Sequence, residues 1–140
     1  WNVRDLVAHA VGSQVAMAGF VGADVATDAD WPAARAAMES VIADPSKLEG
    51  VAEGGPFNGM PKHQVIGIAC GDLLVHAWDL ATAIGADGTL PTDAVQATLM
   101  GLQRFPAEML RSPGMFGAPL PTDDDADPQA KLLAFTGRTA

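Results

Sequence analysis

The sequence predicts an all-α fold, and three observations lead to that prediction. Ala, Leu, Val and Met dominate a hydrophobic fraction of 49%, Tyr is absent, and aromatic residues make up only 6% of the chain. Ala, Leu and Met lose little side-chain freedom in a helix, so this composition favours helices over a sandwich or barrel. Apolar residues also recur at helical spacing. A chain of 140 residues can bury one core, so we expect a single helical domain over residues 1–140.

Start and stop signals predict five helices in order along the chain. The expected ranges are residues 1–23, 32–42, 61–84, 93–111 and 127–135. Side chains suited to capping precede or begin four of them: Asn2 (with Asp5 three residues later), Asp30, Thr92 and Asp127. Gly85 stands where a left-handed residue would end the third helix. Pro106 is expected to kink or end the fourth.

Charge and composition exclude several classes of function. The net charge is −9 and the eight Lys and Arg residues are scattered, so neither nucleic-acid binding nor attachment to an anionic membrane is expected. A lone cysteine and the lack of a visible secretory signal fit a cytoplasmic protein. The apolar stretch 65–84 is long enough to span a membrane, but it contains Asp72, His76 and Asp79, which argue against a span.

Those same three residues form the strongest chemical signal. On a helix, Asp72 and His76 lie about 40° apart and Asp79 lies within about 20° of Asp72, so all three share one stripe. A buried carboxylate needs compensation, which a metal ion, a basic residue from another helix or water in a cleft could provide. Few Arg or Lys residues occur in the other core-like segments, and this favours a cation bound from solution.

The first helix offers a further ligand. One seam at helical spacing has His9 as its only ionisable member; it consists of Leu6, His9, Ser13, Ala16 and Phe20. Ser13 and Ala16 are small and leave space beside the imidazole. Two imidazoles and one carboxylate suit zinc, and also iron(II), nickel or manganese. The alternative is that His9 is a core histidine bonded to a backbone carbonyl, while Asp72 and His76 merely pair within their helix.

Three segments carry a family resemblance: WNVRDLVAH, GDLLVHAWDLATAIG, and FGAPL with a closing LLAFTGR. They resemble the DinB-like superfamily, and most of all the actinobacterial branch that includes mycothiol-dependent maleylpyruvate isomerases. The resemblance spans nearly the whole chain. It implies a four-helix bundle whose metal is held by one early histidine and a later acid-x-x-x-His pair, here His9, Asp72 and His76.

Two departures from the family pattern affect these expectations. Asp72 stands where the isomerases have the longer Glu. Family members usually have a helix before the Trp-containing motif, so the chain is expected to lack the usual first helix. The exposed seam would then need another chain or the second helix to cover it, and we expect a homodimer.

The resemblance implies a thiol-dependent, mycothiol-type transferase or isomerase with a small-molecule substrate. The alternatives are a non-catalytic protein that binds a metal or small ligand, and a structural bundle without metal. No catalytic residue is assigned beyond the metal ligands. Asp79 is expected to accept a hydrogen bond from a ligand, and Arg138 to bind an anionic substrate or cofactor.

The remaining candidates are expected to be structural. Cys70 points away from Asp72 and is predicted to be a packed core thiol, and His63 to face solvent. The acidic run 123–125 is predicted to be a solvated loop. The tryptophans, Trp1, Trp31 and Trp78, are predicted to line the core or a cleft.

Overall fold

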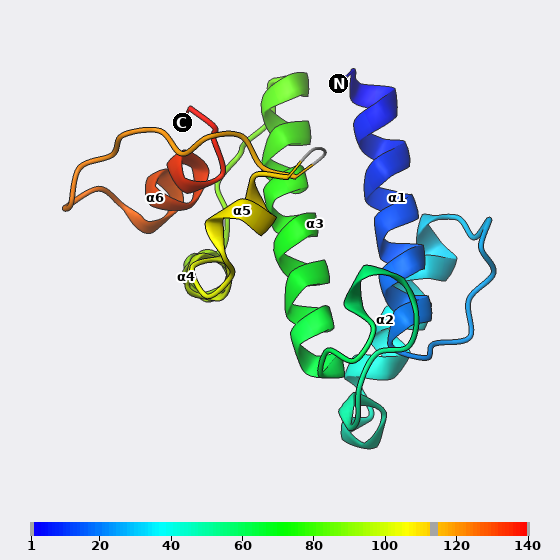
Figure 1. The fold of residues 1–140 in the computed structure, drawn as a ribbon. Coiled ribbons are helices and arrows are strands. Elements are labelled where there is room, and N and C mark those ends of the chain that lie inside the picture. Colours follow the sequence, from blue (N-terminus) through cyan, green and yellow to red (C-terminus); the bar gives the residue numbers. More distant parts are fainter. Residues whose placement is uncertain (1, 113–114, 140) are drawn as a thin grey trace. The chain divides into compact units, whose positions relative to one another are not determined.

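The computed structural model describes residues 2–112 and 115–139, so Trp1 lies outside the described residues. Over these ranges the secondary structure is helical, with one isolated β-bridge between Val51 and Pro61, which confirms the all-α prediction. The α-helices (Figure 1) are α1 (Val3–Phe20), α2 (Trp31–Ile42), α3 (Lys62–Ile84), α4 (Thr92–Leu102), α5 (Ala107–Leu110) and α6 (Pro128–Phe135). Short 3-10 turns occur at Pro45–Leu48 and Gly55–Phe57.

Local capping signals set most helix ends. The Asn2 side chain accepts a hydrogen bond from the Asp5 backbone N–H at 3.0 Å and starts α1. The Asp30 side chain caps α2 by accepting from the Ala33 backbone N–H, and Asp127 caps α6 by accepting from two backbone N–H groups. Gly85 has φ +68° and ends α3 in the left-handed conformation that glycine adopts without steric cost. These predictions are confirmed.

The predicted interruption of the fourth helix at Pro106 is confirmed, but the predicted range of residues 93–111 is wrong in its extent. The chain instead forms α4, which ends at Leu102, and the four-residue helix α5, which begins after Pro106. Proline lacks an N–H and its ring clashes with the preceding turn, so a continuous helix cannot pass through this position without distortion. The predicted Thr92 cap is also wrong, because Pro91 takes the cap position and no side chain bonds to that helix end.

The chain divides into two compact units, residues 1–86 and residues 87–140, which are described separately. The prediction of a single domain over residues 1–140 stays a prediction. In the first unit α1 packs against both α2 and α3. Its core cluster is apolar and draws on all three helices and on the loop between α2 and α3: Met17, Ala18, Val21, Met38, Val41, Ala52, Val65 and Ala69.

Helix α3 is less covered than its composition predicts. Only Val65, Ala69, Gly71 and Val75 are buried along it, and Ile84 is 62% exposed. Within the described residues, α3 is the one helix long and apolar enough to cross a membrane, a test that core helices of soluble proteins also pass. The ionisable stripe on α3 speaks against a span, because charged groups are costly at the bilayer centre.

In the second unit α4 packs against α6, and Leu132 and Leu133 are fully buried. Arg111 holds the segment before α6 to the helix end, since its guanidinium donates to the carbonyl oxygens of Gly117 and Phe135 at 2.7 and 2.8 Å. Gly137 has φ +80°, and a Cβ there would lie 2.9 Å from the Cα of Gly117. The backbone approach at this point therefore requires glycine.

Candidate metal centre

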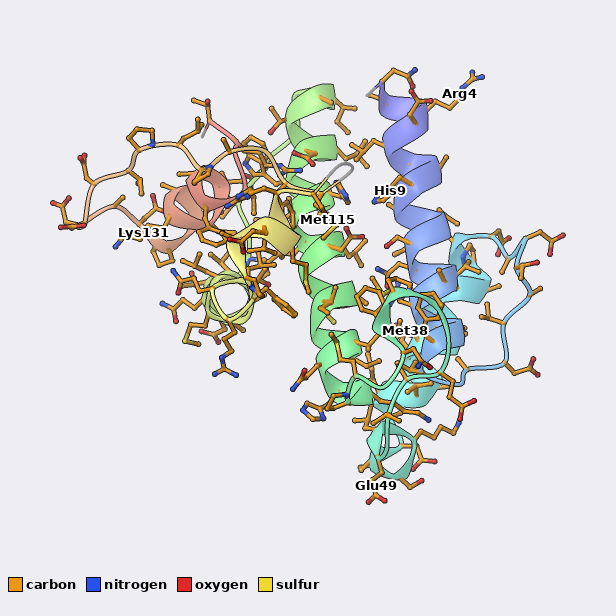
Figure 2. All side chains as sticks on the ribbon, viewed as in Figure 1. Arg4, His9, Met38, Glu49, Met115 and Lys131 are labelled. Carbon is orange, nitrogen blue, oxygen red and sulfur yellow. The ribbon has the colours of Figure 1, made fainter. Side chains whose placement is uncertain are left out.

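The candidate centre is built on the packing of α1 against α3. Ser13 contacts Asp72, and one residue further along α1 the buried Gln14 donates to the carbonyl oxygen of Ala69 at 3.0 Å. As the residue number rises on α1 it falls on α3, so the two helices run antiparallel, side by side in Figure 1. In this register His9 faces His76 from across the helix pair, and Figure 2 shows the His9 side chain on the side of α1 that faces α3.

The structure brings together the three predicted ligands. His9, Asp72 and His76 form a group that could hold a metal ion, with one ligand atom from each and all three atoms within 4.8 Å of one another. The Asp72 Oδ1 atom lies 3.4 Å from His76 Nε2 and 3.8 Å from His9 Nε2. Good N–H···O hydrogen bonds are shorter, at about 2.9 Å. Ligand atoms on a tetrahedral zinc ion lie about 3.4 Å apart, given the usual bond lengths. The Asp72–His76 distance matches this spacing, and the Asp72–His9 distance is longer.

A second contact on each α3 ligand fixes its orientation. The Ser13 hydroxyl donates to Asp72 Oδ2 at 2.8 Å, and His76 Nδ1 lies 2.9 Å from Asp79 Oδ2. With its Nδ1 proton donated to Asp79, a neutral His76 presents the Nε2 lone pair toward Asp72 Oδ1, as metal-binding histidines commonly do. Asp79 thus lies where the sequence predicted it.

Sequence reasoning missed Ser13, which was interpreted only as a small neighbour of the imidazole. Its position one helical turn after His9 was the available signal. In the predicted seam, Leu6 is buried and Ala16 is exposed. In the C-terminal half of α1, the buried residues include Gln14, Met17 and Ala18.

Exposure is uneven across the centre. The His76 side chain is 12% exposed, whereas that of His9 is 37% exposed. The two imidazole rings lie edge to face, with centroids 4.9 Å apart. The α3 ligands are therefore less exposed than His9, whose side of the centre is accessible to an ion or a small ligand.

The two α3 ligands shift each other's protonation in opposite directions. Burial raises the pKa of Asp72, but the contacts with His76 and Ser13 and the charges of the two histidines outweigh burial and hold that pKa below its ordinary value. Burial lowers the pKa of His76, but its contacts with Asp72 and Asp79 and their negative charges raise it to about 9. Without a metal, the centre at neutral pH therefore consists of a protonated imidazole between two carboxylates.

Several other sequence predictions are settled. Cys70 is exposed, so the predicted core thiol is wrong; α3 is too sparsely covered on that side to enclose it, although partial burial raises the pKa of the thiol. His63 and the acidic run 123–125 are exposed, as predicted. Trp31 is exposed rather than in the core, and Trp78 is half-buried.

Arg138 belongs to the second unit. Its guanidinium donates to the Thr136 carbonyl oxygen at 3.0 Å and lies 5.9 Å from the centre of the Phe116 ring. Its predicted role in binding an anionic cofactor stays a prediction.

Comparison with known proteins gives relatives but no activity. No family model matches the chain, and no solved structure matches it. The chain is 27% identical over 147 residues to Uncharacterized protein Rv0738 of Mycobacterium tuberculosis (strain ATCC 25618 / H37Rv), and equally to Uncharacterized protein MT0763 of strain CDC 1551 / Oshkosh. The alignment covers 99% of this chain and 80% of each relative. The chain is thus similar, over nearly its whole length, to mycobacterial proteins whose names state no function.

Proposed function

We propose that the chain binds one divalent metal ion through His9, Asp72 and His76. The observation that carries the proposal is the convergence of two imidazole Nε2 atoms on one carboxylate oxygen. The other oxygen of Asp72 accepts a hydrogen bond from Ser13, and the Nδ1 atom of His76 contacts Asp79. Charge supports it as well. Two carboxylates lie beside two imidazoles that are neutral when they coordinate, so a divalent cation balances the group. Zinc fits this donor set best, with nickel, iron or manganese as alternatives.

We further propose that the fold is a DinB-like bundle and that the protein is a cytoplasmic thiol-dependent transferase or isomerase. Three protein ligands leave a coordination position open, as in catalytic rather than structural sites. A metal there would stabilise a thiolate or lower the pKa of a water molecule. The exposed His9 side gives a low-molecular-weight thiol such as mycothiol, and a small-molecule substrate, a route to the centre.

A non-catalytic metal- or ligand-binding protein is the second candidate, and one observation favours it. Asp72, His76 and Asp79 are engaged with one another, so the carboxylates that could transfer a proton already orient or supply ligands. A cobalt-substituted sample separates the two candidates. A thiolate-to-cobalt charge-transfer band on adding a small thiol supports the transferase or isomerase, and an unchanged spectrum at millimolar thiol supports the binding protein.

Elemental analysis of protein purified without a nickel column tests metal binding itself. We expect about one metal ion per chain, loss of that ion in His76→Ala, and retention in His63→Ala, which removes an exposed histidine from the same helix. Wild-type protein with little or no metal, before and after incubation with zinc, contradicts the proposal. We also propose a homodimer; light scattering that shows a stable monomer at micromolar concentration contradicts that part alone.

A further inference from the structure

We infer that Ser13 is a positioning residue that restricts Asp72 to one metal-binding oxygen, and that it thereby makes the centre discriminate against larger, oxygen-preferring cations such as Mn²⁺ and Ca²⁺. The inference rests on the proposed metal site and specifies which ions that site accepts.

The two oxygens of Asp72 have different surroundings. The Oδ1 atom faces both imidazoles, at 3.4 and 3.8 Å. The Oδ2 atom accepts the Ser13 hydroxyl at 2.8 Å. Hydrogen bonds from hydroxyls to carboxylates are among the stronger ones in proteins, because the acceptor is charged. Turning Oδ2 toward the two imidazoles would break this bond, so Asp72 is held with one oxygen facing the other ligands.

Cations differ in how much binding affinity they lose when Asp72 offers only one oxygen. Zinc is satisfied by four ligands and takes nitrogen donors readily. Calcium takes six to eight oxygens at longer distances, often with a carboxylate that supplies both of its oxygens. Manganese likewise prefers carboxylates and other oxygen donors. A carboxylate confined to one oxygen therefore weakens the larger ions' binding more than that of zinc.

The same helix supplies both a ligand and the restraint. His9 and Ser13 lie one turn apart on α1, on the side that faces α3. The packing of α1 that delivers the His9 imidazole also delivers the hydroxyl that orients the carboxylate on α3. Ligand supply and ligand orientation are therefore set by one helix contact.

The test compares three variants with the wild-type chain. Ser13→Ala removes the hydroxyl, and Ser13→Thr retains one. Ser40→Ala is the matched control, because it removes a helical serine whose hydroxyl bonds to the Ala37 carbonyl oxygen of its own helix, α2. Competition with a chromophoric chelator gives Kd for Zn²⁺ and Mn²⁺. Visible absorption of the cobalt form reports coordination number, and circular dichroism checks that each variant is folded.

For Ser13→Ala we expect zinc affinity to fall about 10- to 100-fold, as is typical when the partner of a ligand is removed. Manganese affinity should fall less than zinc affinity does, so the zinc-to-manganese affinity ratio should fall. The cobalt spectrum should weaken toward that of a five- or six-coordinate ion. Ser13→Thr should restore both readouts, and Ser40→Ala should match the wild type.

Different outcomes test the role of Ser13 and the metal site. A folded Ser13→Ala variant with the wild-type affinity ratio and cobalt spectrum overturns the role of Ser13 and leaves the metal site intact. Equal losses of zinc and manganese affinity, with a changed cobalt spectrum, overturn the selectivity but not the positioning role of Ser13. A wild-type chain that binds neither zinc nor cobalt overturns the proposed metal site, and the role of Ser13 with it.

Discussion

Raising the pH should destabilise the metal-free protein and should not destabilise the zinc-loaded one. The pKa of His76 is raised from 6.5 to about 9 in the folded chain. A group whose pKa is raised by folding adds stability that is complete below the unfolded pKa and is lost as pH rises through the folded pKa. The window of this loss therefore runs from about pH 6.5 to about pH 9.

The size of the effect follows from the shift. A difference of about 2.5 pKa units corresponds to about 3 kcal/mol between the protonated and neutral forms. The His76 side chain is only 12% exposed, so solvent screening reduces this value little. Between about pH 6.5 and about pH 8.5 the free energy of unfolding of the metal-free chain should fall by about 2 kcal/mol.

Zinc should abolish this fall because coordination requires neutral His76, so the bound ion has already displaced its proton. The free energy of unfolding at saturating zinc should then stay level or rise slightly over the same pH range. Urea titrations followed by tryptophan fluorescence measure this directly, since all three tryptophans belong to the first unit, residues 1–86. Samples are compared in chelator and in buffered zinc.

Variants identify the titrating group. His76→Gln should remove the pH dependence of the metal-free chain, whereas His63→Gln, which changes an exposed histidine at the start of α3, should retain it. A metal-free wild-type chain whose stability is constant or rises over this range would refute the reasoning, because it would show that the carboxylates do not hold the proton on His76.

Three further predictions follow from single contacts. Asp79→Asn should weaken zinc binding about 10- to 100-fold in a chelator competition, because it removes the carboxylate that orients the imidazole; the exposed Asp125→Asn should not. Gln14→Ala removes a 5% exposed side chain and its bond to α3, and urea unfolding should show a loss of about 2 kcal/mol. Gly137→Ala should cost more than Gly85→Ala in the same assay, although both have positive φ, because only at Gly137 does a Cβ meet backbone atoms; each pays at least about 1 kcal/mol for the backbone conformation. Equal losses at the two glycines would show that the approach to Gly117 is not tight.

The parts of the fold that local chemistry determines could be predicted from the sequence. Asp30, Asp127 and Gly85 act on the backbone within a few residues of themselves, so their patterns identify helix ends without knowledge of the fold. The stripe on α3 likewise follows from helical periodicity alone. Asp72, His76 and Asp79 therefore lie together, as their spacing predicted.

Features that depend on the partner of each helix could not be predicted in the same way. Ser13 and Asp72 are 59 residues apart in sequence, and nothing local to either indicates that their side chains meet. Cys70 has a core-like composition around it, but whether that face is covered depends on which elements pack there. The exposure of Ala16 has the same cause, because the direction of the α1 contact is set by tertiary packing rather than by its own sequence.

The core cluster contacts α1 near its C-terminus, at Met17 and Ala18, and α3 near its N-terminus, at Val65 and Ala69. His9 lies eight residues before Met17, which is about 12 Å along the helix axis. Metal binding should therefore link α1 and α3 at a distance from this core cluster. Its main mechanical effect would be slower hydrogen exchange at backbone amides in the first turns of α1, with little change at the anchored end.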